Sequence, residues 1–541
     1  MSPGLDEFKW LEYRDFSGGL WERTDREAPQ NGLLTLTDAH PMKNGGLRAY
    51  AKFKAMTHTG LPTNAIVLAL RKTIGFPGPQ GVLMCCTLEL DAGGSGVHTF
   101  RVHVIQNDTT TALIESGTWT TIYTQTGVAN IDPSISIEMY HTLANGFGQY
   151  FNVNALDTAG ASTSLSGVFR TSTTAVLTAT VLAGVGRVIV GNFYPTCLVP
   201  HQDRLMFNVT APGSLTLSRV LFTEPRSDTT PSTANQFEPI GTDAGFIGWM
   251  SPQAPSDLTV GKDERGIILV QGDVTQPLIR EMTFSQYGMV MFPATTEYGI
   301  VYLAENSSVY LWNTAGLKDL SYQFYETPMQ PDVYPASFGV VFSSAVKLGT
   351  MAYGGGYVFA GRDYVLDLET EAWFRVSTLA ENGSGKHFTT DPHNYRVYSA
   401  TNAVYTGINS VLYYTPSYYE ASSEWDPASS YSFTLPMIYE HGRKVKLREI
   451  DYYLTTFSAN NTLEVEVTRA HPTGGTPITE TLQKVTLDVA TNHKVRYPVA
   501  QSGDWLKIKT TLTAPDGEAP MLERVMVGLQ PETRSEVVKR A

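Results

Sequence analysis

The sequence predicts an all-β protein, and two observations carry that prediction. Only 17% of the 541 residues are charged, whereas the chain contains 47 glycines and 28 tyrosines. Such a composition favours strands and turns over helices. Short β-branched and aromatic segments separated by turn residues fill nearly the whole chain. Helical spacing is almost absent, and its best candidate, residues 134–146, begins by alternating like a strand.

Residues 1–50 are predicted to form an extended N-terminal arm. Two Gly-Gly pairs, Gly18-Gly19 and Gly45-Gly46, bracket a segment that contains the strand "LLTLT". Glycine permits backbone conformations that are closed to other residues, so the chain can turn sharply at each pair. The arm would cover an exposed sheet edge, either by completing the last sheet of a ring or by reaching a neighbouring subunit. The sequence leaves both uses open.

Residues 51–425 are predicted to form a diverged β-propeller, with an inserted β subdomain near 95–200 as one variant of that organisation. Three segments repeat the pattern of an apolar strand, a polar turn and a second apolar strand: residues 299–313, 356–376 and 395–407. Repeated hairpins of this kind build propeller blades. The spacing of the repeats is uneven, and a sandwich or a series of unrelated hairpins is the alternative.

Residues 426–541 are predicted to form a C-terminal β-sandwich with a short tail. Near residue 416 the sequence becomes rich in Pro and Ser, and clean polar–apolar alternation with regular turns follows, as in "KVKLREIDYYLTT" and "NTLEVEVTRA". The change in pattern predicts that residues 430–541 fold without the rest of the chain.

The charge and cysteine content exclude several classes of protein. The net charge is −13, and the one dense basic run, "HGRKVKLRE", alternates like the solvent face of a strand, so a nucleic-acid binder is not indicated. Three cysteines cannot form a disulfide framework in so long a chain, and Cys85 and Cys86 should lie on opposite faces of one strand. Neither a signal peptide nor a membrane span is indicated, so synthesis in a cytoplasm is expected.

No catalytic, cofactor-binding or metal-binding residues are predicted, and the chain is not expected to be an enzyme. His387 and His393 flank a loop, but with one aspartate they supply too few ligands for a zinc site. The carboxylates that remain as candidates are Glu297, Asp363, Asp367, Glu369 and Glu371. Glycoside hydrolysis would need two of them at a defined separation. The turn after Asp367 is expected to splay the last four, Asp363, Asp367, Glu369 and Glu371, into solvent.

An aromatic cluster near residue 416 allows a second interpretation. It comprises Tyr413, Tyr414, Tyr418, Tyr419 and Trp425. Exposed rings could stack on sugar faces, whereas packing at the junction of two domains is favoured because apolar surface is usually covered.

The arm resembles the N-terminus of bacteriophage tail proteins built as β-propellers, of the hub, nozzle or adaptor class. The matching residues are Phe16, Gly18, Gly19, Leu20, Asn31, Leu33, Leu34, Gly45, Gly46, Leu47 and Arg48. Looser matches lie in residues 200–209, 219–225 and 296–312 and in "DLETEAWFRV".

The resemblance implies a virion structural protein without catalytic residues. It would form a homo-oligomeric ring, dock other tail proteins and make transient contact with DNA passing through a channel. The alternatives are a receptor- or carbohydrate-binding propeller at the virion tip and, less favoured, a glycan-degrading tail enzyme.

Overall fold

The computed structural model describes most of the chain between residues 9 and 531. Outside the description are 1–8, 23–27, 63–64, 74–80, 90–96, 107–113, 132–134, 158–164, 166, 172–184, 190–193, 212–213, 233, 238–246, 255–256, 263–266, 283–292, 305–307, 314, 324–350, 361–362, 378–383, 392–395, 403–410, 416–424, 440–443, 472–474, 488–490, 516 and 532–541. The regular elements of the described residues are almost all strands, with a short 3₁₀ turn at Ile114–Ser116, which confirms the all-β prediction. None of their helices is long and apolar enough to cross a membrane.

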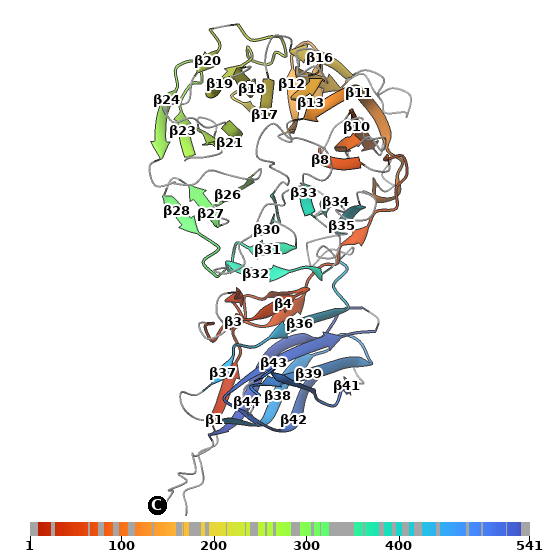
Figure 1. The fold of residues 1–541 in the computed structure, drawn as a ribbon, viewed down its shortest axis with the longest axis vertical. Helices are drawn as coiled ribbons and strands as arrows, with labels where there is room; N and C mark the ends of the chain where they lie inside the picture. Colours follow the sequence, from red (N-terminus) through yellow and green to blue (C-terminus); the bar gives the residue numbers. More distant parts are fainter. Residues whose placement is uncertain are drawn as a thin grey trace, which may run out of the picture.

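Small antiparallel sheets follow one another along the chain and lie around a common centre, and we call them the ring (Figure 1). The first contains β8 (Ala65–Lys72), β9 (Val82–Glu89), β10 (His98–Gln106), β11 (Thr120–Ile131) and β14 (Ala155–Asp157). The second contains β12 (Ile137–Thr142), β13 (Gly146–Val153), β15 (Gly167–Thr171) and β16 (Val185–Ile189). The third contains β17 (Tyr194–His201), β18 (Arg204–Ala211), β19 (Ser214–Phe222) and β20 (Gln236–Phe237).

The remaining ring sheets repeat this arrangement. The fourth contains β21 (Ile247–Ala254), β22 (Asp257–Lys262), β23 (Ile267–Gln271) and β24 (Leu278–Met282). The fifth contains β25 (Ala294–Thr296), β26 (Gly299–Leu303), β27 (Val309–Asn313) and β28 (Gly316–Asp319). The sixth contains β29 (Ala352–Gly354), β30 (Tyr357–Ala360), β31 (Tyr364–Asp367) and β32 (Ala372–Arg375). The seventh contains β33 (Ser384–Asp391), β34 (Arg396–Asn402), β35 (Val411–Thr415) and β7 (Lys54–Ala55).

The first strand of every ring sheet lines one cavity of about 380 Å³. The contributing strands are β8, β12, β17, β21, β25, β29 and β33. A single cavity bordered by all of these strands places them around one axis. The region near 95–200, for which an inserted subdomain is one sequence interpretation, supplies strands β10 to β16 of the first two ring sheets and the start of the third.

A strand from near the N-terminus completes the seventh sheet. Ala55 and Lys54 in β7 pair with Tyr413 and Tyr414 in β35, and Met56 N donates to Leu412 O at 2.8 Å. The ring is therefore closed by pairing between residues far apart in sequence, which removes an exposed sheet edge. The strand that closes it follows "LLTLT" rather than being that segment.

Two further sheets, which we call the C-terminal sheets, lie beside the ring (Figure 1). One contains β42 (Asn492–Gly503), β38 (Val445–Thr455), β44 (Met521–Pro531), β6 (Leu47–Ala49), β5 (Ala39–Pro41) and β1 (Lys9–Tyr13). The other is continuous with the sixth ring sheet and adds β4 (Thr35–Thr37), β36 (Ser430–Thr434), β43 (Trp505–Thr513), β39 (Asn461–Arg469), β40 (Ile478–Thr481), β37 (Ile438–Tyr439) and β41 (Val485–Leu487).

The described part of the N-terminal segment pairs with the end of its own chain. Strand β1 pairs with β44 from Lys9↔Leu529 to Tyr13↔Val525, and β4 lies between β36 and β32. A further pair, β2 (Gly19–Leu20) and β3 (Gly32–Leu33), is parallel. Strands β1, β4, β5 and β6 of the segment predicted as an extended arm are thus part of the C-terminal sheets.

The hairpin repeat read from the sequence is confirmed in its first two copies. Strands β26 and β27 pair in the first, and β30 and β31 pair in the second, where β31 ends at Asp367 and Trp373 follows in β32. In the third copy the strand β34 is confirmed, but its hairpin partner β35 begins only at Val411. Residue 404, where the sequence places that partner, lies outside the described residues.

Opposite faces of β9 enter different cores, as the cysteine pair predicts. Cys86 packs with Val102 and Phe151, whereas Cys85 packs with Trp119 and Leu412. Burial raises the pKa of both thiols, which keeps them protonated and inert.

Candidate functional site: the junction between the ring and the C-terminal sheets

The residues that carry the phage-tail resemblance meet one another at the junction between the ring and the C-terminal sheets. Phe16 N donates to Gly45 O at 3.0 Å, and Gly18 N donates to Asn31 O at 3.1 Å. Phe16 is fully buried, with its ring centroid 6.1 Å from that of Phe433. The three parts of the pattern therefore form a single packed unit, which we call the junction.

Two of the junction glycines are required by backbone geometry. Gly19 has a φ of 58°, and an added Cβ would lie 2.7 Å from Trp373 O. Gly45 has a φ of 89°, and an added Cβ would lie 2.5 Å from Arg14 O. Both combine a left-handed backbone with contact against another segment, so no larger residue fits. This confirms the conformational role that the sequence assigns to the glycine pairs.

Arg48, the basic residue at the end of the pattern, makes a bidentate ion pair. Its Nε lies 2.5 Å from Glu518 Oε1 and its Nη2 lies 3.2 Å from Glu518 Oε2. Its guanidinium also lies 5.7 Å from the ring centroid of Phe457. These contacts tie β6 to the loop before β44, so Arg48 has a structural partner within the same chain.

A continuous sheet and a shared core connect the junction to the ring. Arg375 in β32 pairs in parallel with Thr37 in β4, and Asp38 N donates to Arg375 O at 2.8 Å. Trp373 is fully buried, and its indole nitrogen donates to Leu320 O at 2.6 Å. One hydrophobic cluster runs from Val301 in the ring to residues of β44. The two parts of the molecule consequently share their core.

Carboxylates of the junction are partly buried and held by hydrogen bonds. Asp38 accepts the amide of Ser377 at 2.8 Å and its hydroxyl at 2.5 Å. Glu22 accepts the hydroxyl of Tyr364, with the shorter contact at 2.9 Å. Burial raises the pKa of Asp38 and of Glu22, and the charge of Asp363 acts in the same direction.

Two of the five carboxylates selected from the sequence are buried, and the other three are at least partly exposed. Asp363 is 2% exposed and accepts from Arg375 Nε at 2.6 Å. Asp367 is 8% exposed and accepts from Glu369 N and Thr370 Oγ1, both at 2.9 Å. The expectation that the turn splays the last four of them into solvent is wrong for these two, because each stabilises local backbone or a neighbouring cation.

Glu369 and Glu371 do point outward. Glu369 forms an ion pair with Lys43 at 2.5 Å, and Glu371 forms one with Lys318. The two ion pairs link carboxylates at the β31–β32 turn to lysines of two other segments, the β5–β6 turn and β28.

A pocket of about 630 Å³ lies where the β5–β6 turn meets ring turns. Glu297, Asp367 and Glu369 line it, together with the half-exposed ring of Tyr298. Burial, together with a hydrogen bond from its hydroxyl to Glu297 Oε1 at 3.1 Å, raises the pKa of neighbouring Tyr353 to about 12. The pocket is acidic and offers an aromatic face.

The aromatic cluster near residue 416 is not an exposed platform in its described part. Trp425 packs against the shared core, with its ring centroid 6.4 Å from that of Tyr50, and Tyr414 packs against the core of Leu412. The favoured interpretation, packing at the junction of two parts of the molecule, holds for Trp425, whereas Tyr414 packs between sheets of the ring. Tyr418 and Tyr419 and the side chain of Tyr413 lie outside the described residues.

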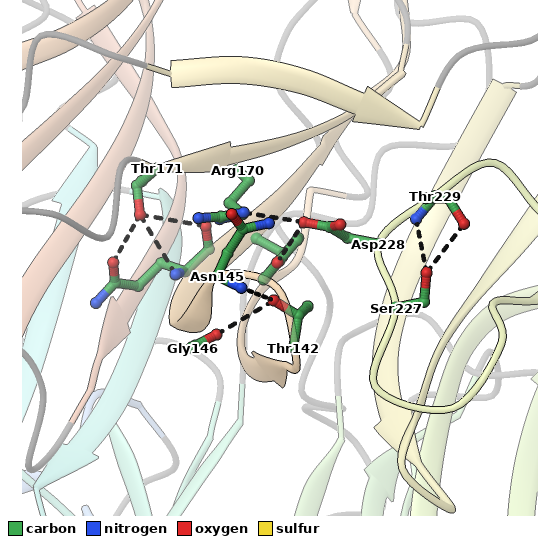
Figure 2. Close-up of polar contacts among 10 residues, drawn as sticks. Thr142, Asn145, Gly146, Arg170, Thr171, Ser227, Asp228 and Thr229 are labelled. Carbon is green, nitrogen blue, oxygen red and sulfur yellow. Dashed lines mark hydrogen bonds and ion pairs between the residues drawn. The ribbon is translucent and has the colours of Figure 1, made fainter.

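A second buried charge cluster ties two neighbouring ring sheets (Figure 2). Asp228, in the loop after β19, accepts from Arg170 Nη1 at 3.1 Å and from the hydroxyl of Tyr150 at 2.9 Å. The side chains of Arg170 and Asp228 are each 12% exposed. Beside them Thr142 Oγ1 accepts from Asn145 N at 3.1 Å and closes the β12–β13 turn. These contacts anchor the third sheet to the second.

Histidines give no ligand group among the described residues. His103 is fully buried between two hydroxyls, with Nε2 2.9 Å from Thr87 Oγ1 and Nδ1 3.0 Å from Thr121 Oγ1. Burial lowers its pKa to about 4, so it is neutral at physiological pH. The side chains of His387 and His393 lie outside the description. No group of three or more potential metal ligands occurs in the part of the chain that the structure describes.

Sequence reasoning missed Glu22, Asp38 and Arg375 as members of the junction. A signal was present for Asp38, because a polar residue directly after "LLTLT" commonly ends a strand. Its φ of 62° is consistent with that role. Nothing in the sequence indicates that its partner is Ser377, 339 residues away.

Comparisons with known proteins give limited information. No family model matches the chain, and no curated protein matches it. Among solved structures, the chain is similar to BamB from Moraxella catarrhalis, with 9% sequence identity and a TM-score of 0.28. That match covers 69% of this chain and 98% of BamB. A likeness this weak carries no argument about function.

Proposed function

We propose that the chain is a structural subunit of a bacteriophage tail, of the hub, nozzle or adaptor class. In this proposal the ring is a diverged seven-bladed β-propeller and the C-terminal sheets are a β-sandwich, with the N-terminal segment built into it. The subunit forms a homo-oligomeric ring in the virion and docks other tail proteins. It has no enzymatic activity.

The proposal rests on the role that the residues of the tail-like sequence pattern have in the fold. Its residues do not surround a pocket but join the ring and the C-terminal sheets, through one continuous sheet and one shared core. A subunit that transmits force needs its two parts at a fixed relative position. A shared hydrophobic core fixes that position better than a flexible linker does. The net charge of −13 also suits a protein that DNA must pass without adhering.

Carbohydrate binding at the virion tip is the second candidate. It is favoured by the acidic pocket of about 630 Å³, in which Glu297 and Glu369 could accept hydroxyl protons beside the ring of Tyr298. The aromatic cluster that first suggested this function does not supply the site in its described part.

Three measurements on the purified full-length protein separate these functions. Negative-stain electron microscopy should show rings, a glycan array should show no binding, and a polysaccharide depolymerisation assay should show no product. Glycan binding that Tyr298→Ala abolishes would favour the second candidate. Hydrolysis of a surface polysaccharide would contradict both candidate functions and favour a glycan-degrading tail enzyme.

A further inference from the structure

The central cavity of the ring has an ordered wall. The residues that line it are 69–71, 135–138, 197–200, 250–252, 293–295, 351–353 and 388–390, one run from each first strand or its start. The last residue of each run is partly or fully exposed: Arg71, Glu138, Pro200, Pro252, Thr295, Tyr353 and Thr390. The residue before it is buried in every case. The more exposed part of the wall is therefore formed by the last residue of each run, and we call these seven residues the mouth.

The mouth carries two charged groups, and they are adjacent. Arg71 Nη2 lies 3.3 Å from Glu138 Oε2, and the two residues come from the neighbouring strands β8 and β12. The Arg71 side chain is 48% exposed and that of Glu138 22%. A guanidinium has five N–H donors and a carboxylate about four acceptor positions, so this single contact uses a small part of their capacity.

Most hydroxyl groups of the wall are engaged with one another, with the backbone or, for Tyr353, with the Glu297 carboxylate. Ser251 Oγ lies 2.5 Å from Thr295 Oγ1, Ser136 Oγ accepts from Leu198 N at 2.6 Å, and Thr389 Oγ1 accepts from Lys72 N at 2.9 Å. Much of the remaining wall is apolar, including Leu70, Ile137, Val199 and Met351. Recognition of a polar ligand thus falls to Arg71 and Glu138, above an apolar interior.

We propose that the mouth of the central cavity binds a small zwitterion, of the class of free α-amino acids with an apolar side chain. A simple anion would be repelled by Glu138 and a simple cation by Arg71, whereas a zwitterion places its carboxylate on Arg71 and its ammonium on Glu138. The ligand's apolar side chain would enter the interior. A volume of about 380 Å³ lies at the small end of ligand pockets, which fits a molecule of this size. The site does not depend on the tail function.

Binding to the purified full chain can be measured by isothermal titration calorimetry with three related probes. L-Leucine carries both charges, N-acetyl-L-leucine only the carboxylate and L-leucinamide only the ammonium. Leucine is expected to bind at one site per chain, and each capped compound at least about tenfold more weakly, equivalent to about 1.4 kcal/mol. Equal binding of the capped compounds, or no saturable binding of leucine, glycine or phenylalanine, would overturn the proposal.

Substitutions of the two charged mouth residues test whether leucine binds at the mouth. Arg71→Gln and Glu138→Gln should each weaken leucine binding about tenfold or more, whereas Lys509→Gln, which breaks an ion pair with Glu466 on a C-terminal sheet, should not change it. The double variant Arg71→Glu with Glu138→Arg keeps both charges and should retain binding within a few-fold. If either glutamine variant does not fold, the charge-exchange variant and the capped probes still show whether the mouth binds a zwitterion. Leucine binding that both glutamine variants leave intact would refute the assignment.

Discussion

At the scale of single residues, buried polar groups of this protein act as ties between segments. Asp228 and Asp38 each accept two hydrogen bonds from partners in other strands or loops. Exposed pairs such as Lys43–Glu369 add little, because solvent screens them. The contrast gives two predictions.

Replacing Asp228 by alanine should destabilise the protein by about 3 kcal/mol, because the buried guanidinium of Arg170 would lose its charge partner. Chemical denaturation followed by circular dichroism measures this change. Glu369→Ala, which removes an exposed carboxylate of the same ring, serves as the control and should leave the denaturation midpoint unchanged. Equal effects of the two substitutions would show that the Asp228 cluster does not anchor the sheets.

The junction carboxylates predict a dependence of stability on pH. The pKa of Asp38 is raised in the folded state, mainly by burial. The stability that its protonated form contributes is therefore fully present below its ordinary pKa of 3.8 and is lost as the pH rises through the raised value. Thermal melts should show Asp38→Asn more stable than the parent at about pH 8 and equal to it at about pH 4. A loss of stability that is the same at both pH values would contradict this account.

At the scale of strands, local pattern predicts elements well and partners poorly. Alternation in "KVKLREIDYYLTT" predicts β38, whose Val445, Leu447 and Ile450 are buried while the neighbouring lysines and arginine are more exposed. In the best helical candidate, 134–146, the described residues contain β12 and the turn into β13 instead, because cross-strand pairing outweighs weak helical spacing. Pairing of β4 with β36 joins residues almost 400 positions apart, as in the Thr35–Thr434 contact, and no local pattern encodes it.

The same limit applies to the candidate site. The glycine pattern indicates sharp turns at the junction but not the chain segments that press against those turns. Burial of Asp363 could not be predicted, because it depends on Arg375 from the adjoining strand and on the packing of the sixth sheet against the N-terminal segment.

Strand pairing changes what is expected of an isolated C-terminal fragment. In residues 426–541 alone, β44 would lack β1 and β6, and β36 would lack β4. We therefore expect that fragment to show strand content without a cooperative unfolding transition. Fusing residues 9–50 to it through a flexible linker should restore cooperativity in urea denaturation. A cooperative transition for the fragment alone would restore the independent domain that the sequence predicts.

At the scale of the whole molecule, the ring and the C-terminal sheets share one core and one sheet. A force applied to the ring would reach the C-terminal sheets through packed side chains and the β4–β32 pairing rather than through a flexible connection. The proposed structural subunit would need this rigidity in an assembly that repeats it around an axis.

The most direct test of the structural-subunit account is the native mass of the purified full-length protein, measured by native mass spectrometry across a range of concentrations. The account predicts a single closed oligomer with a fixed integer number of chains, because cyclic assembly stops when the ring is complete. A monomer at every concentration, both alone and when mixed with the other proteins of the same particle, would contradict it.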